Sequence, residues 1–408
     1  MTMIMPLLMN PDVVVIGASI SGLMHALVLR STGRSVVVLE ARSQQQIQAI
    51  GAGLSFWPNA QRLLTMCIPD MHFDSWAVKN STMEILTRDG LPVIELPISE
   101  DIWTSSWSAM REKLVEACEQ DVPGYGTVQI WINQRVCDLV DKDDHINVIY
   151  RIEDGPVKSV AANLVIAADG ARSFVRNRFL PNTSPKYAGY LAWRGRFPES
   201  EAPRELDGAL AGKMAFFMFD GSYILAYLAP DANGSMVSGD RYIEWCWYDA
   251  CDVSSPEFSE YMTDRYGMQH NMTVSADLLH PKTWAAQLSR RKDVVPPIWQ
   301  SLFAKSTLPL LTAIHSFDND HAAFYSGKLL LAGEAYTQIR PHLGASCDIA
   351  ALQAILLPEV LDGRMSIVEW ERTVAIYARN KSIGSAATGE FGMTGKWPDG
   401  YVATFARP

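Results

Sequence analysis

The sequence lacks the cysteine patterns of a metal site or a disulfide scaffold. Its six cysteines are scattered along 408 residues, without a CxxC pair or a cysteine–histidine spacing suited to zinc. A chain of this length also buries enough apolar surface to fold without disulfides. We therefore expect no bound metal, reduced thiols and a cytoplasmic protein.

Clusters of positive charge and long apolar runs are missing too. The formal net charge is −10, and lysine and arginine form no patch of the kind that contacts phosphate backbones. No stretch reaches the roughly 18 to 20 apolar residues of a membrane span, and residues 1–9 lack the basic flank of a signal peptide. The sequence predicts a protein that binds neither nucleic acid nor a membrane.

What remains is an ordinary globular composition in a chain too long for one core. Hydrophobic residues make up 48% and charged residues 20%, which is typical of compact domains. There is no internal repeat or low-complexity tract. We expect two structural units that share an interface.

The N-terminal part has the pattern of a βαβ unit. A β-branched run at Val13–Ile16 predicts a strand buried on both faces, residues 21–29 have helical apolar spacing, and residues 36–39 form a second buried run. Gly17, Ser19 and Gly22 occupy the three glycine places of GxGxxG between the first strand and the helix. A small serine at the middle place still allows backbone to approach a pyrophosphate, and its hydroxyl can donate to phosphate.

An acidic residue follows at the spacing that this motif requires. Glu40 ends the second strand, roughly 20 residues after the glycine turn, where it can accept hydrogen bonds from ribose hydroxyls. Ser21 and Arg42 flank these two positions and are further candidates for cofactor contacts. Together these features predict dinucleotide binding, but they do not separate NAD from FAD.

Two later segments favour FAD. Asp169 follows a buried strand within residues 160–167, and Gly333 and Glu334 follow another at residues 328–332. A proline at position 341 and Gly344 come next. In this order the segments resemble those of the FAD-dependent aromatic hydroxylases of the para-hydroxybenzoate hydroxylase type, over nearly the whole chain.

The resemblance implies roles for several of these residues. It places Glu334, where the family has aspartate, on the flavin ribityl chain, and it places the backbone of Gly344, Ala345 and Ser346 at the isoalloxazine edge. Asp169 would contact FAD and the nicotinamide cofactor. The loop of Gly51, Ala52 and Gly53, with Leu54, would lie against the flavin ring. The family's ribityl-contacting arginine is replaced by Trp107, with Arg111 one turn further along a helix expected at residues 107–118.

We expect an α/β fold with interleaved domains. A Rossmann-like FAD-binding domain with a parallel sheet would span residues 10–186, with an excursion to the substrate domain near residues 68–105. A mainly antiparallel substrate-binding sheet domain, rich in tryptophan and tyrosine, would span residues 187–317. The FAD-binding domain would resume at residues 318–408, with a helix at residues 348–361 and, in the last forty residues, a helix followed by glycine-rich coil.

The resemblance implies an FAD-dependent monooxygenase that uses NADPH or NADH and dioxygen, and it suggests a homodimer. It would hydroxylate or epoxidise an aromatic or heteroaromatic small molecule through a flavin hydroperoxide. A base near the ring would deprotonate a substrate hydroxyl. The candidates for catalysis are His342, Arg194 and Tyr223.

Two alternatives stay open. Glu334, Ser346 and Trp107 also suit a flavoprotein with non-oxygenating chemistry, such as an oxidase, a dehydrogenase or an isomerase. The fold is equally compatible with a dinucleotide-binding sensor that has no turnover.

Overall fold

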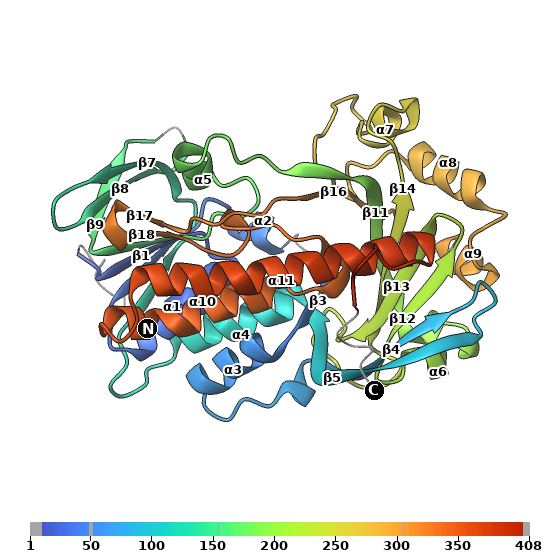
Figure 1. Cartoon of the computed structure of the whole chain (residues 1–408), viewed down its shortest axis with the longest axis horizontal. Coiled ribbons are helices and arrows are strands. Elements are labelled where there is room, and N and C mark those ends of the chain that lie inside the picture. The colour runs from blue at the N-terminus through green and yellow to red at the C-terminus, as the bar shows by residue number, and fades with distance from the viewer. Residues whose placement is uncertain (1–9, 49–51, 154, 305, 403–408) are drawn as a thin grey trace.

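The computed structural model describes residues 10–48, 52–153, 155–304 and 306–402, which form two regions side by side. Figure 1 shows a layered α/β region that contains the N-terminal strand and a second region built on a large sheet. The long helix α11 (Ile367–Thr394) runs along both regions. Residues 1–9 and Gly51, about which the sequence led to expectations, lie outside the described residues.

The first region is organised by a six-stranded sheet. Its central strands are parallel and consist of short apolar runs that are buried on both faces, as the sequence predicted. Only the two-residue edge strand is antiparallel to its neighbour. The strand order is β17 (Ala323–Phe324), β18 (Leu329–Leu331), β10 (Leu164–Ala167), β1 (Val13–Ile16), β2 (Val36–Leu39) and β6 (Val128–Trp131).

Helices and a small sheet cover this parallel sheet. Helix α1 (Ile20–Ser31) packs between α4 (Trp107–Glu119) and α10 (Ser346–Leu361), and α10 also packs against α3 (Pro58–Cys67) and α11. An antiparallel sheet of β7 (Arg135–Asp141), β8 (Ile146–Arg151) and β9 (Lys158–Ala162) lies beside it. Two short helices complete the region, α2 (Gln44–Gln48) and α5 (Phe174–Phe179).

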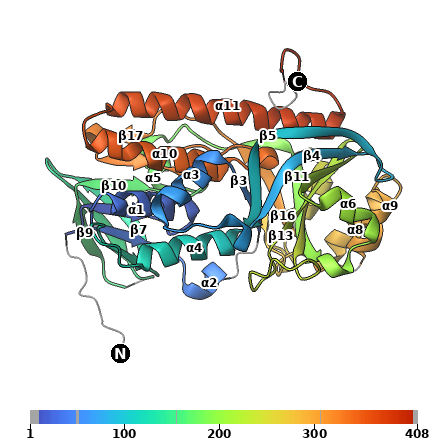
Figure 2. The same cartoon turned by 90° about the horizontal axis from the view of Figure 1, so that it is seen from below.

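The second region is built on a nine-stranded sheet that is antiparallel except where β4 meets β12. Figure 2 shows the long strand β5 reaching from this sheet toward α4. Three of its strands come from the N-terminal part of the chain, at residues 53–56, 78–86 and 92–106, and the last two coincide with the stretch expected to make an excursion near residues 68–105. The strand order is β15 (Thr273–Val274), β16 (Leu310–Ser316), β11 (Lys186–Pro198), β14 (Tyr242–Ala250), β13 (Ser222–Ala229), β12 (Lys213–Phe219), β4 (Val78–Leu86), β5 (Pro92–Ser106) and β3 (Gly53–Phe56).

The back of the large sheet faces an aromatic core. Trp193, Trp245 and Trp247 point into this core and meet Trp284 and Phe303 from the covering helices. The covering helices are α6 (Asp207–Leu210), α7 (Pro256–Tyr261), α8 (Pro281–Arg291) and α9 (Pro297–Phe303). Much of the tryptophan content of this region therefore stabilises the fold behind the sheet. The front of the sheet packs partly against α11, and the rest of this face can line a site.

Two expectations about secondary structure were wrong, and one strand was not predicted. Residues 160–167 belong to two strands in different sheets, β9 and β10, because the chain bends at Asn163, a polar residue that interrupts the apolar run. Strand β7 was missed. Gly384, Gly389 and Gly392 are helical rather than coil, because α11 continues to Thr394. Close packing needs two of them: a Cβ at Gly389 would lie 2.3 Å from His342 Nε2, and one at Gly392 would lie 2.5 Å from the Tyr223 ring.

None of the helices in the described part of the chain has the length and apolarity to cross a membrane. Within the same residues, no group of three or more histidine, cysteine or acidic side chains is arranged to hold a metal. Short 3-10 helices connect several elements, at Phe73–Ser75, Glu199–Glu201, Arg204–Leu206, Tyr325–Gly327, Gly333–Ala335 and Pro341–Leu343.

Candidate functional site

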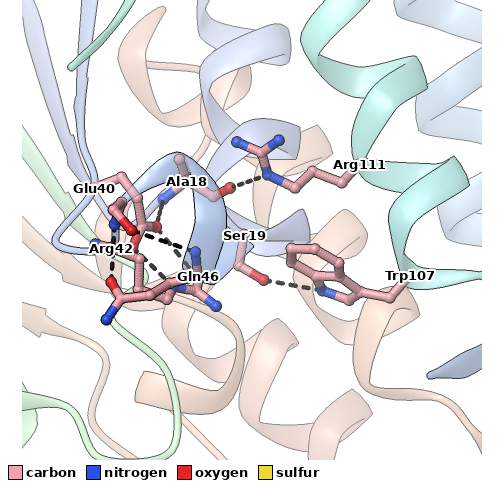
Figure 3. Close-up of polar contacts among 8 residues, drawn as sticks. Ala18, Ser19, Glu40, Arg42, Gln46, Trp107 and Arg111 are labelled. Atoms are coloured by element: carbon pink, nitrogen blue, oxygen red, sulfur yellow. Dashed lines mark hydrogen bonds and ion pairs between the residues drawn. The ribbon is translucent and has the colours of Figure 1, made fainter. Parts of the chain in front are cut away.

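The glycine turn after β1 has the geometry of a close-approach loop. Gly17 has φ of +102°, and a Cβ at Gly22 would lie 1.9 Å from the Gly17 carbonyl oxygen, so side chains are excluded there. Ser19 is the N-cap residue of α1 but makes no side-chain capping bond. Its Oγ instead accepts a hydrogen bond of 3.3 Å from Trp107 Nε1 (Figure 3). The first turn of α1 therefore keeps N–H groups that can bind an anion.

Glu40 is a buried, ionised acceptor beside this turn. Its Oε2 accepts from the Ala18 N–H at 2.8 Å, and its Oε1 accepts from the N–H and the Nε of Arg42 at 2.9 and 3.0 Å (Figure 3). Burial raises the pKa of Glu40, but the hydrogen bonds and charge of Arg42 outweigh it and leave the pKa lowered. A carboxylate offers about four acceptor positions, so Glu40 can still bind a ribose hydroxyl.

Arg111, in helix α4, forms a hydrogen bond to the same turn. Its Nε donates to the Ala18 carbonyl oxygen at 3.1 Å (Figure 3). Trp107 lies near both Arg42 and Arg111, whose guanidinium carbons are each 6.0 Å from the centre of its ring. An indole close to two arginines thus occupies the position that, by the resemblance, holds arginine in the family.

Asp169 has a well-defined structural role at the end of β10. Its Oδ1 accepts from Ser173 Oγ at 2.6 Å and its Oδ2 accepts from the Val175 N–H at 3.2 Å. Burial raises the pKa of this carboxyl group. These bonds shape the turn before α5, next to Gly17, whose added Cβ would lie 3.5 Å from the Asp169 Cα. A direct contact between Asp169 and a cofactor stays a prediction.

The segment with Gly333 and Glu334 packs against the glycine turn at residues 17–22. Gly333 has φ of +59°, its N–H donates to Gln353 Oε1 at 2.8 Å, and a Cβ on it would lie 2.5 Å from Ser21 Oγ. Ser21 Oγ is buried and has no hydrogen-bond partner among the described residues. Glu334 lines a cavity that is open to solvent. Its side chain is therefore exposed, although it lies below the protein surface. Burial raises the pKa of Glu334, against the charge of Arg194.

The backbone of the loop before α10 packs closely against β3 at a position without a side chain. Gly344 has φ of +61°, and a Cβ on it would lie 1.9 Å from Ser55 Oγ, which donates to the Gly344 carbonyl at 3.4 Å. Ala345 is fully buried and Ser346 begins α10. Gly53 and Leu54 lie in β3, at the edge of the same loop.

Some of these segments line one side of a cavity of about 580 Å³ between the two regions, at residues 52–55, Trp107, Glu334, Gly344 and Ser346. We call this side the motif wall, and we include in it the motif residues that do not reach the cavity, namely residues 17–22, Glu40 and Gly333. The opposite side is the front of the nine-stranded sheet. We call it the sheet wall and define it by Arg194, Arg196, Leu225, Tyr227, Glu244, Cys246 and Tyr248.

Strand register brings the side chains of the sheet wall together. Residues of β11, β14 and β13 that lie opposite one another form cross-strand rows, and alternate residues of each strand face the cavity. The rows are Ala192, Tyr248 and Tyr223, then Arg194, Cys246 and Leu225, then Arg196, Glu244 and Tyr227.

The three predicted catalytic residues have different surroundings. Arg194 and His342 line the cavity, whereas Tyr223 is fully buried outside its lining. Both ring nitrogens of His342 are taken: Nε2 bonds the Tyr190 hydroxyl at 2.6 Å and Nδ1 bonds the Tyr223 hydroxyl. Burial, with the charges of Arg340 and Arg194, lowers the pKa of His342 to about 3. This histidine is neutral and held in place, so it is poorly suited to accept a substrate proton.

Sequence reasoning missed Glu244. This residue is buried on the sheet wall, and its Oε1 has no hydrogen-bond partner within the described residues. Burial raises its pKa to about 7, against the charge of Arg196 and a hydrogen bond from the Gly53 N–H. In the sequence, one acidic residue in an aromatic strand is typical of a solvent-facing position. Only the register shows that it faces a cavity.

The fold and the cavity define a class of protein. A parallel sheet with a glycine turn, a mainly antiparallel sheet beside it and a glycine-lined cavity between them are the features of a flavoprotein of two interleaved units. Two family models match the chain, "FAD binding domain" over residues 10–190 and "FAD binding domain-like" over residues 187–316. Residues 10–190 therefore form an FAD-binding domain, and the chain as a whole is similar to FAD-dependent aromatic hydroxylases.

Named relatives agree with this assignment. The chain is 29% identical to the 2,6-dihydroxypyridine 3-monooxygenase of Paenarthrobacter nicotinovorans over 88% of the chain and 86% of that protein. It is 25% identical to the 6-hydroxynicotinate 3-monooxygenase of Pseudomonas fluorescens over 91% and 88% of the two chains. The solved structure of 2,6-dihydroxypyridine-3-hydroxylase from Arthrobacter nicotinovorans has a TM-score of 0.80 at 24% identity, covering 97% and 96%. The chain is an oxidoreductase, an FAD-dependent monooxygenase that uses NAD(P)H, and the two alternatives are not supported.

Proposed function

We propose that this protein inserts one oxygen atom into a hydroxylated nitrogen heteroaromatic ring, of the hydroxypyridine class, bound between the motif wall and the sheet wall. The observation that carries the proposal is the mixed sheet wall. It sets Arg194, Arg196 and Glu244 among apolar and aromatic side chains, opposite the glycine-lined loops. Charged groups in an apolar cavity suit a flat ring with ionisable hydroxyl groups. The names of the two pyridine-oxidising relatives support the same class.

The residues of the motif wall suit FAD. The N-terminus of α1 and Ser21 would hold the pyrophosphate, Glu40 would hold the adenosine ribose, and Glu334 would hold the ribityl chain. The backbone around Gly53 and Gly344 would lie against the ring system. When bound there, FAD would supply the oxygen chemistry with two electrons from NAD(P)H, so that the substrate, NAD(P)H, a proton and dioxygen would give the hydroxylated product, NAD(P)+ and water.

The chain's own contribution is to bind and orient the substrate and to exclude water. Arg194 Nε is buried without a hydrogen-bond partner in the described structure, so it is a natural donor to a substrate oxygen. His342 and its two tyrosine partners hold the floor of the cavity rigid. A cytoplasmic location fits the six free cysteines, and a homodimer is tested by the mass of the protein in solution.

The test is substrate-dependent oxygen insertion. The purified protein should carry a flavin absorption spectrum and should oxidise NADH or NADPH faster when 2,6-dihydroxypyridine or 6-hydroxynicotinate is added. Isotopically labelled dioxygen should appear in the product. A colourless protein that cannot be reconstituted with FAD, or NAD(P)H oxidation that yields only peroxide with every hydroxypyridine, would overturn the proposal.

A further inference from the structure

Glu244 lies at the point where the sheet wall touches the motif wall. A Cβ built on Gly53 would lie 2.8 Å from Glu244 Cγ and 2.4 Å from the Tyr227 hydroxyl. Both side chains therefore pack directly on the backbone of Gly53, and the Gly53 N–H bonds the Glu244 carboxylate. Gly53 belongs to the segment that the resemblance places against the flavin ring.

The carboxylate of Glu244 is incompletely satisfied. It is 6% exposed, and Oε1 has no hydrogen-bond partner in the described part of the chain. A buried carboxylate oxygen without a partner is costly, and such groups are retained where a ligand supplies the missing bond. Since Glu244 lines the cavity, a molecule bound there can supply it.

The groups that face Glu244 come from three strands. Arg196 lies opposite it on β11, Tyr227 lies opposite it on β13, and the Gly53 N–H approaches from β3. Arg196 is also held over the Tyr242 ring, with its guanidinium carbon 4.6 Å from the ring centre. The positive charge of Arg196 favours the ionised carboxylate, whereas burial disfavours it.

Most other titratable groups on the cavity wall are less suited to accept a proton, and His315, which also lines the cavity, has its Nδ1 bonded to the Ala313 carbonyl oxygen at 2.7 Å. His342 has both ring nitrogens bonded to tyrosines. Burial raises the pKa values of the Cys246 thiol and of the Tyr227 and Tyr248 hydroxyls. Glu334 lies on the opposite wall, among the FAD-binding motifs.

We propose that Glu244 accepts the proton of a substrate ring hydroxyl, while Arg196 and Tyr227 hold the resulting oxyanion. This inference rests on the proposed function. The O–H bond of the substrate breaks, its proton goes to Glu244 Oε1, and the electron pair stays on the ring oxygen and spreads into the ring. The ring carbon that receives the new oxygen becomes more nucleophilic, and it later loses its own hydrogen as a proton when aromaticity is restored.

The pKa of Glu244 suits a group that accepts a proton near neutral pH. With a pKa near 7, the carboxylate is partly ionised there and accepts a proton most readily above that value. The wild-type kcat/KM should therefore rise with pH through about 7.

The experiment compares the purified wild-type holoprotein with Glu244→Gln, which keeps the shape and removes the base. With 2,6-dihydroxypyridine, kcat/KM at pH 7 should fall by about 100-fold or more. The rise near pH 7 should disappear and be replaced by one at the substrate's own pKa. In anaerobic titrations at pH 7.5, wild-type protein should bind the ionised ligand, seen as a long-wavelength ligand band that Glu244→Gln does not produce.

A matched control exists on the same strand. Asp249 is a buried carboxyl group with a raised pKa, but it faces the other side of the sheet, where it bonds Gln287 at 2.7 Å. Asp249→Asn should keep the wild-type pH profile and the ligand band. Glu244→Asp, which restores a shorter carboxylate, should recover part of the activity and the rise near pH 7.

The outcomes separate the two proposals. Wild-type protein that hydroxylates no hydroxypyridine overturns the proposed function. Wild-type hydroxylation with an unchanged pH profile and ligand band in Glu244→Gln overturns only the role of Glu244. A third outcome is that Glu244→Gln loses FAD, as judged by its visible spectrum, while Glu244→Asp binds FAD but shows no rise of kcat/KM near pH 7. Glu244 would then have a structural role only, and the inference would be wrong.

Discussion

The two walls of the cavity are specified in different ways. The motif wall depends on backbone shape: Gly17, Gly333 and Gly344 have positive φ, and Gly22 has no room for a side chain. The sheet wall depends on side chains that strand register brings together from β11, β13 and β14. The first wall is encoded locally and suits a cofactor that many proteins share. The second is encoded by long-range pairing and can change from one substrate to another.

The comparison predicts that a glycine of the motif wall is the most damaging single change. In Gly22→Ala, the new Cβ would lie 1.9 Å from the Gly17 carbonyl oxygen, so the turn has to open. We expect loss of FAD and a decrease of about 3 kcal/mol in the free energy of unfolding. Flavin content and urea unfolding measure these effects.

A control glycine with free space is available. Gly208 lies in α6, and no atom lies within 4 Å of a Cβ built on it. Gly208→Ala should keep FAD and stability. Equal FAD contents in the two variants would show that the turn does not govern cofactor binding.

A change on the sheet wall should leave the motif wall intact. Arg194→Met retains an apolar stem but removes a donor, so we expect KM for hydroxypyridines to rise about 10- to 100-fold, or roughly 1.5 to 3 kcal/mol. Flavin content should not change. Arg135→Met, at an exposed position of β7, serves as the control. A loss of FAD in Arg194→Met would remove the distinction between the walls.

The sequence predicted the motif wall far better than the sheet wall, and the reason is physical. The turn at Gly17, the acceptor Glu40 and the buried runs of β1, β2 and β18 are properties of contiguous segments. Glu244 and Tyr227 become neighbours only when β14 and β13 pair in one register. Tyr223 was a reasonable aromatic candidate, but neither alternation nor composition showed that His342 and Gly392 enclose it.

A smaller effect is the contribution of His342 to the pH dependence of the free energy of unfolding. In the folded state the pKa of His342 is lowered to about 3, mainly by burial, whereas the unfolded chain has an ordinary value near 6.5. The unfolded state therefore binds more protons in this range, so His342 stabilises the fold above about pH 6.5 and loses this contribution as pH falls toward 3. The slope is about 1.4 kcal/mol for each pH unit.

His342→Gln should reduce that dependence. Urea unfolding between pH 7 and pH 5 should show a smaller decrease for the variant than for wild type, although the variant is less stable at pH 7. His25 is a second buried histidine whose pKa is lowered by burial, to about 4, and it lies away from the cavity in α1. A variant that keeps the full pH dependence would mean that His342 is protonated in the folded protein.

The mildest change tests Glu334, the acidic residue of the motif wall that lines the cavity. Glu334 carries one methylene more than the family's aspartate, and it reaches into the cavity toward the charge of Arg194. Glu334→Asp should alter FAD affinity only a few-fold, because the backbone of Gly333 and the Ser21 contact stay in place. Its kcat/KM for hydroxypyridines should change no more than its FAD affinity does. A large loss of oxygen insertion with FAD fully bound would instead show that Glu334 acts on the substrate, so that both walls contribute a working carboxylate.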